Sequence, residues 1–216
     1  MQDRAEATRR LILRSAAEQF DRKGYAATGI AEITAQAGCT SGALYFHFAG
    51  KDQLAAAVIE EHFAYWQPLV ARAEQLRAPA LEQLVALSFA VMRAFRDDVV
   101  VRAGGRLWNE RRAIDARLPV PFVGWIATTS RILGRAKAEG TLQPHIDPER
   151  AAELLVCSLF GVHIVSDTLD GRTLVEEHLT GLWLLVLPGL RADRDDPDGG
   201  HRDLVERCRF HLPQEQ

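Results

Sequence analysis

Apolar residues recur every three or four positions along most of the chain, which is the spacing of one face of an α-helix. In residues 5–23, Ile12, Ala16 and Phe20 follow one another at intervals of one helical turn. No stretch alternates apolar and polar residues with the period of two that a half-buried strand produces. The pattern therefore predicts an all-α protein.

Glycine, proline and capping residues divide this pattern into successive helices. We expect further helices at about 28–37, 40–48, 52–77, 79–96, 99–112, 122–138, 148–168 and 173–187. Pro68 is expected to kink the longest of these, and Pro188 with Gly189 to end the last one.

The stretch that begins at Gly38 reads as a tight turn followed by a short helix. Gly38 supplies the left-handed conformation that ends the preceding helix, and Thr40 has the side chain of an N-cap. Leu44 and Phe48 are spaced to lie on the inner face. The polar groups that remain outside belong to Tyr45, His47 and Lys51. A second helix that presents such groups after a tight turn predicts a helix-turn-helix that binds DNA.

Composition and charge refine this picture. The 216 residues are 47% hydrophobic and 25% charged, as in an ordinary soluble globular protein. Residues 1–51 carry seven Lys or Arg against five Asp or Glu, whereas the rest carries 19 against 24. The chain thus has a mildly basic N-terminal segment (residues 1–51, the head) and an acidic remainder (the body). This distribution fits a DNA-binding domain attached to a larger domain. We expect a DNA-binding domain at 1–51, a helical body at 52–190 and a polar tail at 191–216. The tail should begin with a mobile segment and contain a short helix at 201–212.

The remaining chemistry is sparse. Cys39, Cys157 and Cys208 are far apart and match neither a disulfide framework nor a metal site. No apolar run reaches the roughly 18 residues of a transmembrane helix, and the N-terminus lacks the apolar core of a signal peptide. The sequence has no zinc-ligand spacing, phosphate loop or nucleophile elbow. We therefore expect a cytoplasmic protein with no membrane partner, cofactor, metal or catalytic residues.

The first 54 residues resemble the TetR family of bacterial transcriptional repressors. The matching elements are Thr8-Arg9, Ile12-Leu13, Ala16-Ala17, Phe20, Gly24-Tyr25, Thr28, Ile30, Ile33, Ala37-Gly38 and Gly42-x-Leu44-Tyr45-x-His47-Phe48-x-x-Lys51-x-x-Leu54. The resemblance implies that the head sits on a helical body that dimerises through its last two long helices, here about 148–168 and 173–187.

The resemblance also implies which residues contact DNA. Tyr45, His47 and Lys51 match positions that bind phosphates and so set the register on the duplex. Thr40, Ser41 and Gly42, at the start of the helix, are placed to read base edges. Two positions depart from the family pattern. Ser41 stands where relatives often have lysine, and Gly29 stands where threonine is usual, so we expect Thr28 to supply the missing hydroxyl.

The body resembles a narrower branch, the γ-butyrolactone receptors. The matching segments are Ala94-Phe95-Arg96-Asp97-Asp98, Val101-Arg102-Ala103-Gly104-x-Arg106-Leu107, Leu118-Pro119-x-Pro121-Phe122-x-x-Trp125 and Leu155-Val156-x-Ser158-x-x-Gly161. That branch includes receptors for furan-type and butenolide signals that control antibiotic production. The resemblance implies that Trp125 lines the signal pocket, although indoles more often pack in a core.

Further pocket candidates lie on apolar helix faces, where a place in the core and a place on the pocket wall are both open. They are Phe89, Met92, Trp108, Phe160 and His163. Arg106 either binds a ligand carboxylate or pairs with Glu110 one turn later. We favour the ion pair.

These observations together predict a homodimeric repressor that binds a pseudo-palindromic operator in double-stranded DNA. A small diffusible signal of the γ-butyrolactone, butenolide or furan type would release it, and its targets would be antibiotic or secondary-metabolite genes. The alternatives are a TetR-type regulator of an efflux system that senses a drug-like ligand, and a carrier or enzyme that does not bind DNA.

Overall fold

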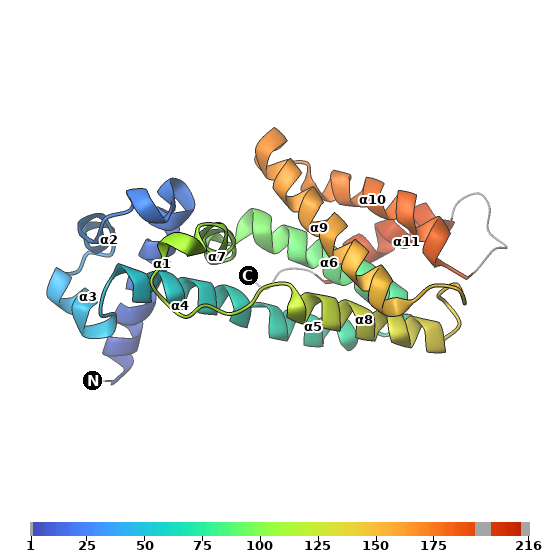
Figure 1. The fold of residues 1–216 in the computed structure, drawn as a ribbon, viewed down its shortest axis with the longest axis horizontal. Coiled ribbons are helices and arrows are strands. Elements are labelled where there is room, and N and C mark those ends of the chain that lie inside the picture. The colour runs from blue at the N-terminus through green and yellow to red at the C-terminus, as the bar shows by residue number, and fades with distance from the viewer. Residues whose placement is uncertain (1, 193–199, 213–216) are drawn as a thin grey trace. The chain divides into compact units, whose positions relative to one another are not determined.

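The computed structural model describes residues 2–192 and 200–212, and over these the chain is α-helical (Figure 1). Most of the charged segment that was expected to be mobile, residues 193–199, lies outside the described residues. The only pairing of extended backbone in the described part is an isolated bridge between Leu142 and Arg191. The all-α prediction is confirmed.

The helix bounds follow the predicted breaks closely. The helices are α1 Gln2–Ala27, α2 Ile30–Gln36, α3 Ser41–His47, α4 Lys51–Ala64, α5 Trp66–Glu74, α6 Ala80–Asp97, α7 Val99–Asn109, the short 3-10 turn η1 Arg111–Ala113, α8 Val123–Ala138, α9 Pro148–Asp170, α10 Val175–Leu190 and α11 Gly200–Arg209.

The described helices divide between two compact units. Unit 1 comprises Met1–Gln67 and Asp98–Pro119, and unit 2 comprises Pro68–Asp97 and Val120–Gln216. The chain therefore passes from one unit to the other three times. Helix α7 packs on α1 and α4 within unit 1. These units reflect packing, and the domain boundaries expected at residues 51 and 190 remain a prediction.

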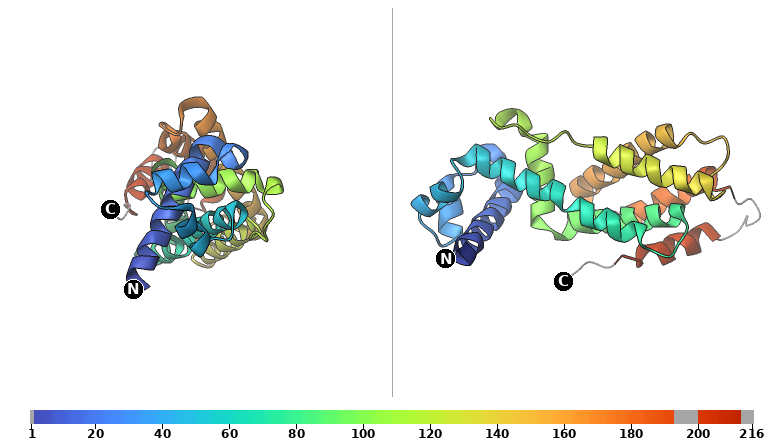
Figure 2. Two further views of the ribbon diagram at one scale, coloured as in Figure 1. Left: turned by 90° about the vertical axis from the view of Figure 1, so that its left-hand side faces the viewer. Right: turned by 90° about the horizontal axis from the view of Figure 1, so that it is seen from below.

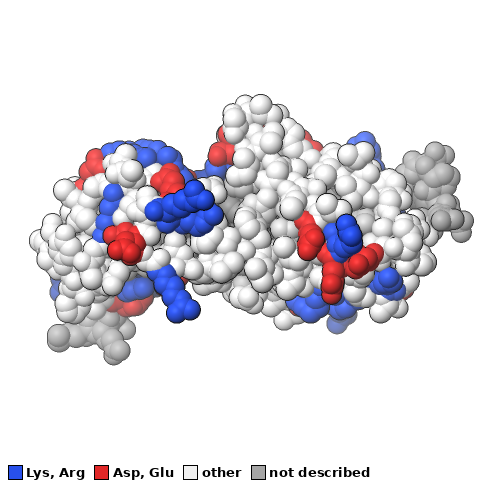
Figure 3. Space-filling view, viewed as in Figure 1, with Lys and Arg blue, Asp and Glu red and all other residues white. Residues whose placement is uncertain are grey.

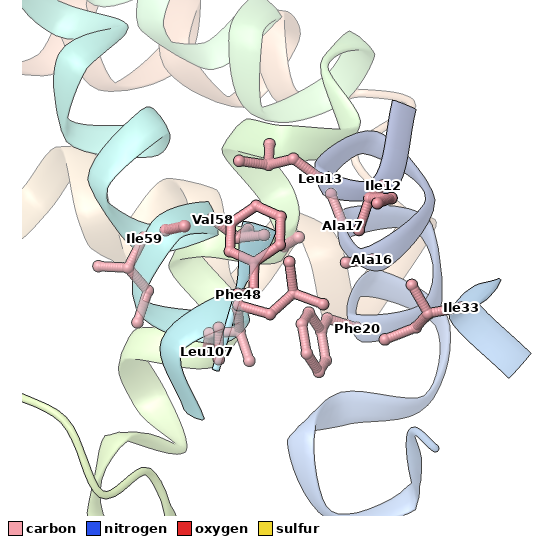
Figure 4. Packing of buried hydrophobic residues seen from close by; sticks show 14 of the residues in the cluster. Ile12, Leu13, Ala16, Ala17, Phe20, Ile33, Phe48, Val58, Ile59 and Leu107 are labelled. Atoms are coloured by element: carbon pink, nitrogen blue, oxygen red, sulfur yellow. The ribbon is translucent and has the colours of Figure 1, made fainter. Parts of the chain in front are cut away.

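Unit 1 is built around a core of apolar side chains from α1, α2, α3, α4 and α7 (Figure 4). Ile12, Ala16 and Phe20 of α1 are all fully buried, as their spacing predicts. Gly24 then adopts φ 79°, a left-handed conformation that breaks the helix although hydrogen bonding continues to Ala27. Leu107 of α7 completes the core.

Two prolines act differently from the expectation. The long helix expected to kink at Pro68 is divided in two before that residue. Helix α4 stops at Ala64 and α5 starts at Trp66. A proline ring clashes with the carbonyl four residues before it, here that of Ala64, and is tolerated in the first turn of a helix.

The prediction that Pro188 ends the last long helix is wrong, because α10 runs on to Leu190. The end of α10 is held by backbone hydrogen bonds. Gln143 N donates to Leu190 O (2.8 Å) and Ala192 N donates to Thr141 O (3.0 Å). These two bonds anchor the end of α10 beyond Pro188.

In unit 2, α6 is buried on nearly all sides and packs against α8, α9, α10 and α11 (Figure 2). Among the described helices, α9 is long and apolar enough to cross a membrane by length and composition alone. Its residues Leu155, Val156 and His163 are buried in unit 2, whereas Leu154, Ile164 and Leu169 are exposed.

A cluster of charges fastens α11 within unit 2. The Glu176 carboxylate of α10 accepts hydrogen bonds from Arg96 Nη1 (2.8 Å) and Arg209 Nε (2.8 Å). Arg93 donates to the carbonyls of Arg209 (2.8 Å) and Leu212 (2.7 Å). Burial alone would raise the pKa of Glu176, but the hydrogen bonds from Arg209 and Arg96 outweigh it and hold that pKa below its ordinary value.

Candidate DNA interface and ligand cavity

The predicted turn and second helix are present in unit 1. Gly38 has φ 60°, the left-handed conformation that the turn between α2 and α3 requires. Thr40 caps α3, because its hydroxyl accepts a hydrogen bond from Ala43 N at 3.1 Å. Helix α2 begins at an unusual cap, Gly29, whose N–H donates to the Glu32 carboxylate (3.2 Å).

Helix α3 has one buried and one exposed face. Leu44 and Phe48 are 0% and 4% exposed and fix the helix on the core of unit 1. Ser41, Gly42, Tyr45 and Phe46 are all exposed, and His47 is half-buried. The surface in the region of α3 is mainly uncharged in Figure 3. The arrangement offers polar and aromatic groups at the position where a helix-turn-helix presents its second helix to the major groove.

A chain of polar contacts supports the start of α4. The Tyr25 hydroxyl donates to Asp52 Oδ1 (2.6 Å), which also accepts from the backbone N–H of Asp115 (2.7 Å). Burial and the Asp52 carboxylate raise the pKa of Tyr25 to about 12. Lys51 Nζ lies 4.3 Å above the Tyr25 ring and donates to Ala26 O (3.3 Å). The ammonium group of Lys51 is thus held by a cation–π contact in the described conformation.

The contact between α4 and α7 is unusually close. A Cβ atom at Gly104 would lie 2.3 Å from Cβ of His62, so only glycine fits there. His62 Nδ1 lies 2.8 Å from Val101 O, and because a carbonyl only accepts, Nδ1 carries the proton. Burial lowers the pKa of His62 to about 4, so the ring is neutral at pH 7.

Unit 2 contains an apolar cavity between α6, α8 and α9. It is lined by Leu84, Leu87, Ser88, Val91, Met92, Phe95, Trp125, Thr129, Val156, Leu159, Phe160 and His163. No Lys, Arg, Asp or Glu is among these residues. The Ser88 hydroxyl is already engaged, since it donates to Val85 O (2.6 Å) and accepts from Trp183 Nε1 (2.8 Å). The open volume is about 30 Å³, about a tenth of that of a small ligand site.

Aromatic rings contribute to the cavity wall. The rings of Phe95 and His163 pack at a tilt with centroids 3.9 Å apart. Phe122 packs edge-to-face on Phe160 at 4.4 Å. The backbone of Phe122 has φ 65°, a conformation that costs a bulky residue about 1–3 kcal/mol. Within the described residues, no group of three or more His, Cys, Asp or Glu side chains is placed to hold a metal ion.

Comparison with known families identifies the chain. Residues 12–58 match the bacterial regulatory proteins of the TetR family. Residues 78–192, more than half of the chain, match the tetracyclin repressor-like C-terminal domain. The chain belongs to the TetR family.

Several relatives of this TetR-family chain are receptors. The A-factor receptor protein of Streptomyces griseus is 35% identical over 189 residues, which are 88% of this chain and 66% of that receptor, just under two thirds of its length. A solved γ-butyrolactone receptor (ArpA-like protein) is 32% identical, with a TM-score of 0.80 over 97% of this chain and 100% of that one. CprB from Streptomyces coelicolor, solved in complex with its biological operator sequence, is 33% identical with a TM-score of 0.82 over 96% and 98%.

The structure of this TetR-family chain places most predicted DNA contacts on one surface, around α3. Ser41, Gly42 and Tyr45 are exposed, and Thr40 is exposed although its hydroxyl caps the helix. Thr28 is different, because it is only 2% exposed and its hydroxyl donates to Gly24 O at 2.7 Å. A buried hydroxyl with an internal partner does not reach a phosphate, so we leave Thr28 out of the interface.

The predicted pocket residues divide into two groups. Met92, Trp125, Phe160 and His163 all line the cavity in unit 2. The others do not line it. Phe89 is fully buried, and Trp108 packs edge-to-face on Phe63. Arg106 forms the ion pair with Glu110 that the sequence favoured, at 3.1 Å, and also donates to Asp21 O (2.7 Å). We therefore leave Phe89, Trp108 and Arg106 out of the pocket.

Two features were missed in the sequence. Phe46 is 79% exposed, and it was not singled out from the sequence. Its helical angle, opposite to Leu44, was a usable signal. The Tyr25–Asp52–Asp115 chain joins residues far apart in sequence and left no local signal.

Proposed function

We propose that this protein is a transcriptional repressor that binds operator DNA as a homodimer and is released by a small diffusible signal. The signal is of the γ-butyrolactone, butenolide or furan type, and the regulated genes belong to antibiotic or secondary metabolism. One observation carries this proposal: similarity to a γ-butyrolactone receptor extends over 97% of the chain, through the body as well as the head.

The exposed face of α3 supports the DNA-binding part of the proposal. Tyr45, His47 and Lys51 bind operator phosphates and set the register of the head on the duplex. Ser41 and Gly42, at the start of α3, approach base edges in the major groove. The α3 sequence itself contains no Lys or Arg, so phosphate contacts from its flanks contribute much of the affinity.

The apolar outer faces of α9 and α10 support dimerisation. Large apolar side chains stand exposed on these helices at Leu154, Ile164, Val165, Leu169 and Leu185. Such a surface is unfavourable in water and is typical of a subunit interface. In the dimer, the two α3 helices enter successive major grooves about 34–36 Å apart, which requires a pseudo-palindromic operator.

The cavity around Trp125 supports signal binding. Its walls suit an apolar ligand, and Thr129 and His163 are polar residues in its lining. Because the cavity is far smaller than a bound signal, its walls must move when the signal enters. That requirement makes the signal prefer one conformation of the body over another, which is the condition for allosteric release. Coupling of about 1–3 kcal/mol is typical of such systems.

We also propose that the protein has no catalytic role and works in the cytoplasm. The cavity lining includes no Asp or Glu, and the hydroxyl of its Ser88 is bonded to Val85 O and Trp183 Nε1. A DNA-binding repressor of bacterial genes works in the cytoplasm, where the three free cysteines also remain reduced.

A gel-shift titration tests the proposal. The full-length protein is incubated with DNA from upstream of its own gene, with and without a synthetic γ-butyrolactone, and with a lipophilic cationic drug as the comparison. We expect a shifted protein–DNA complex. The lactone should dissociate this complex, and the drug should not. Release by the drug alone would instead favour the efflux regulator, and absence of any shift would favour a carrier or enzyme.

A further inference from the structure

Phe46 is the most exposed of the large apolar and aromatic side chains in the described part of unit 1. It is 79% exposed, compared with 54% for Tyr45 and 50% for Leu11. Leaving a phenyl ring in water forgoes the stabilisation that its burial would provide. The packing of unit 1 does not use this ring, whereas Leu44 and Phe48 of the same segment are buried.

The position of Phe46 on α3 directs the ring outward. With 3.6 residues per turn, Phe46 lies about 160° from Leu44 around the helix axis, at the crest of the exposed face. Helical side chains lean toward the N-terminus, so the ring covers the turn that contains Gly42. Gly42, one turn before Phe46, has no side chain that would cover the ring.

A neighbouring ring holds Phe46 in place. His47 packs edge-to-face against it, with the ring centroids 5.0 Å apart. His47 itself is half-buried and also contacts the ring of Phe48, at a centroid distance of 6.4 Å. The exposed phenyl ring is therefore supported from one side, which reduces the entropy lost when it contacts a partner.

The chemistry of this exposed face indicates what the ring contacts. α3 offers Ser41, Tyr45 and Phe46 toward the groove and contains no Lys or Arg that would read guanine. In the major groove the one apolar feature of a base pair is the C5-methyl group of thymine, and phenylalanine is among the side chains that contact it.

We propose that Phe46 reads sequence by packing against the C5-methyl group of a thymine in each half of the operator. The proposal rests on the DNA-binding function proposed above and deepens it. Phe46 contributes a base preference, and Tyr45 and His47 beside it contribute affinity through phosphates.

The test separates a methyl contact from general binding. The full-length protein selects its operator from a pool of random duplex DNA, and each thymine of the selected site is then replaced singly by deoxyuridine, which lacks only the methyl group. Dissociation constants are measured by fluorescence anisotropy for the wild type and for Phe46→Ala. Phe46→Leu serves as the matched control, because it keeps an apolar side chain.

At one position in each half-site, deoxyuridine should weaken wild-type binding about fourfold, as expected for the loss of one buried methyl group. The same replacement should leave Phe46→Ala unaffected, and Phe46→Leu should retain part of the effect. Equal losses in wild type and Phe46→Ala at every thymine would overturn this assignment and leave the proposed function standing. Failure to enrich any DNA would overturn both.

Discussion

The interior of unit 1 differs from the cavity of unit 2 in how its polar groups are held. In unit 1 such groups are committed to partners: His62 to the carbonyl of Val101, and Tyr25 and the Asp115 N–H to the Asp52 carboxylate. The cavity of unit 2, by contrast, is an open space of about 30 Å³ with mostly apolar and aromatic walls. A network of hydrogen bonds specifies one arrangement, whereas an apolar cavity leaves room for another. The difference suits a fixed reading surface in one unit and a responsive site in the other.

The largest effect expected from this comparison is an acid sensitivity of unit 1. The folded protein holds the pKa of His62 at about 4, whereas the unfolded chain has the ordinary value of about 6.5. Between these values the unfolded state binds a proton that the folded state does not. Stability should therefore fall as the pH drops from about 6.5 to about 4, by up to about 3 kcal/mol. Urea unfolding followed by tryptophan fluorescence measures this.

His62→Gln is the matched control, because a glutamine side chain keeps an amide donor and does not titrate. Groups other than His62 titrate in both proteins, so the difference between the two pH profiles isolates His62. An identical pH dependence in wild type and variant would show that His62 is not the group responsible.

A pair of glycine substitutions compares the packing of the two units directly. Gly104→Ala should destabilise by about 1–3 kcal/mol, because the new Cβ would lie 2.3 Å from that of His62. Gly134→Ala, on α8 of unit 2, meets no atom within 4 Å and should stabilise by up to about 1 kcal/mol through helix propensity. Both changes are read from thermal or urea unfolding. Similar effects at the two sites would mean that α4 and α7 separate easily.

The smallest effect concerns DNA contact alone. Tyr45→Phe removes one hydroxyl from the exposed face of α3 and should weaken operator binding by about 1 kcal/mol, roughly fivefold. The loss should be similar across operator variants, because a phosphate contact carries no base preference. Anisotropy titrations with a set of single-base operator variants measure it. A change in the preferred base would move Tyr45 from phosphate contact to base reading.

The fold was largely predictable because the signals that set it are local. Gly24, Asp98 and Pro148 mark breaks or caps within a few residues of sequence, and each lies where a helix begins or breaks in the structure. The exceptions depend on the surroundings. Pro188 remains inside α10 because the backbone at 141–143 holds the end of that helix, and no local pattern encodes that pairing.

The candidate sites were predictable only in part, for the same physical reason. The buried face of α3 follows from the spacing of Leu44 and Phe48, so Tyr45 was correctly placed on the exposed face, whereas the exposure of Phe46 was missed. The cavity depends on how α6, α8 and α9 pack together. Periodicity identified the apolar residues on those helices but did not separate Met92, which lines the cavity, from Phe89, which does not.

If the cavity in unit 2 controls when unit 1 releases DNA, changing the cavity wall should change the response to the signal. To test this, a γ-butyrolactone is titrated into the complex of the protein with fluorescently labelled operator, for the wild type and for Trp125→Ala. We expect equal operator affinity without signal, release of the wild type, and a Trp125→Ala complex that persists at the same signal concentration. Release of both proteins at the same concentration would contradict it.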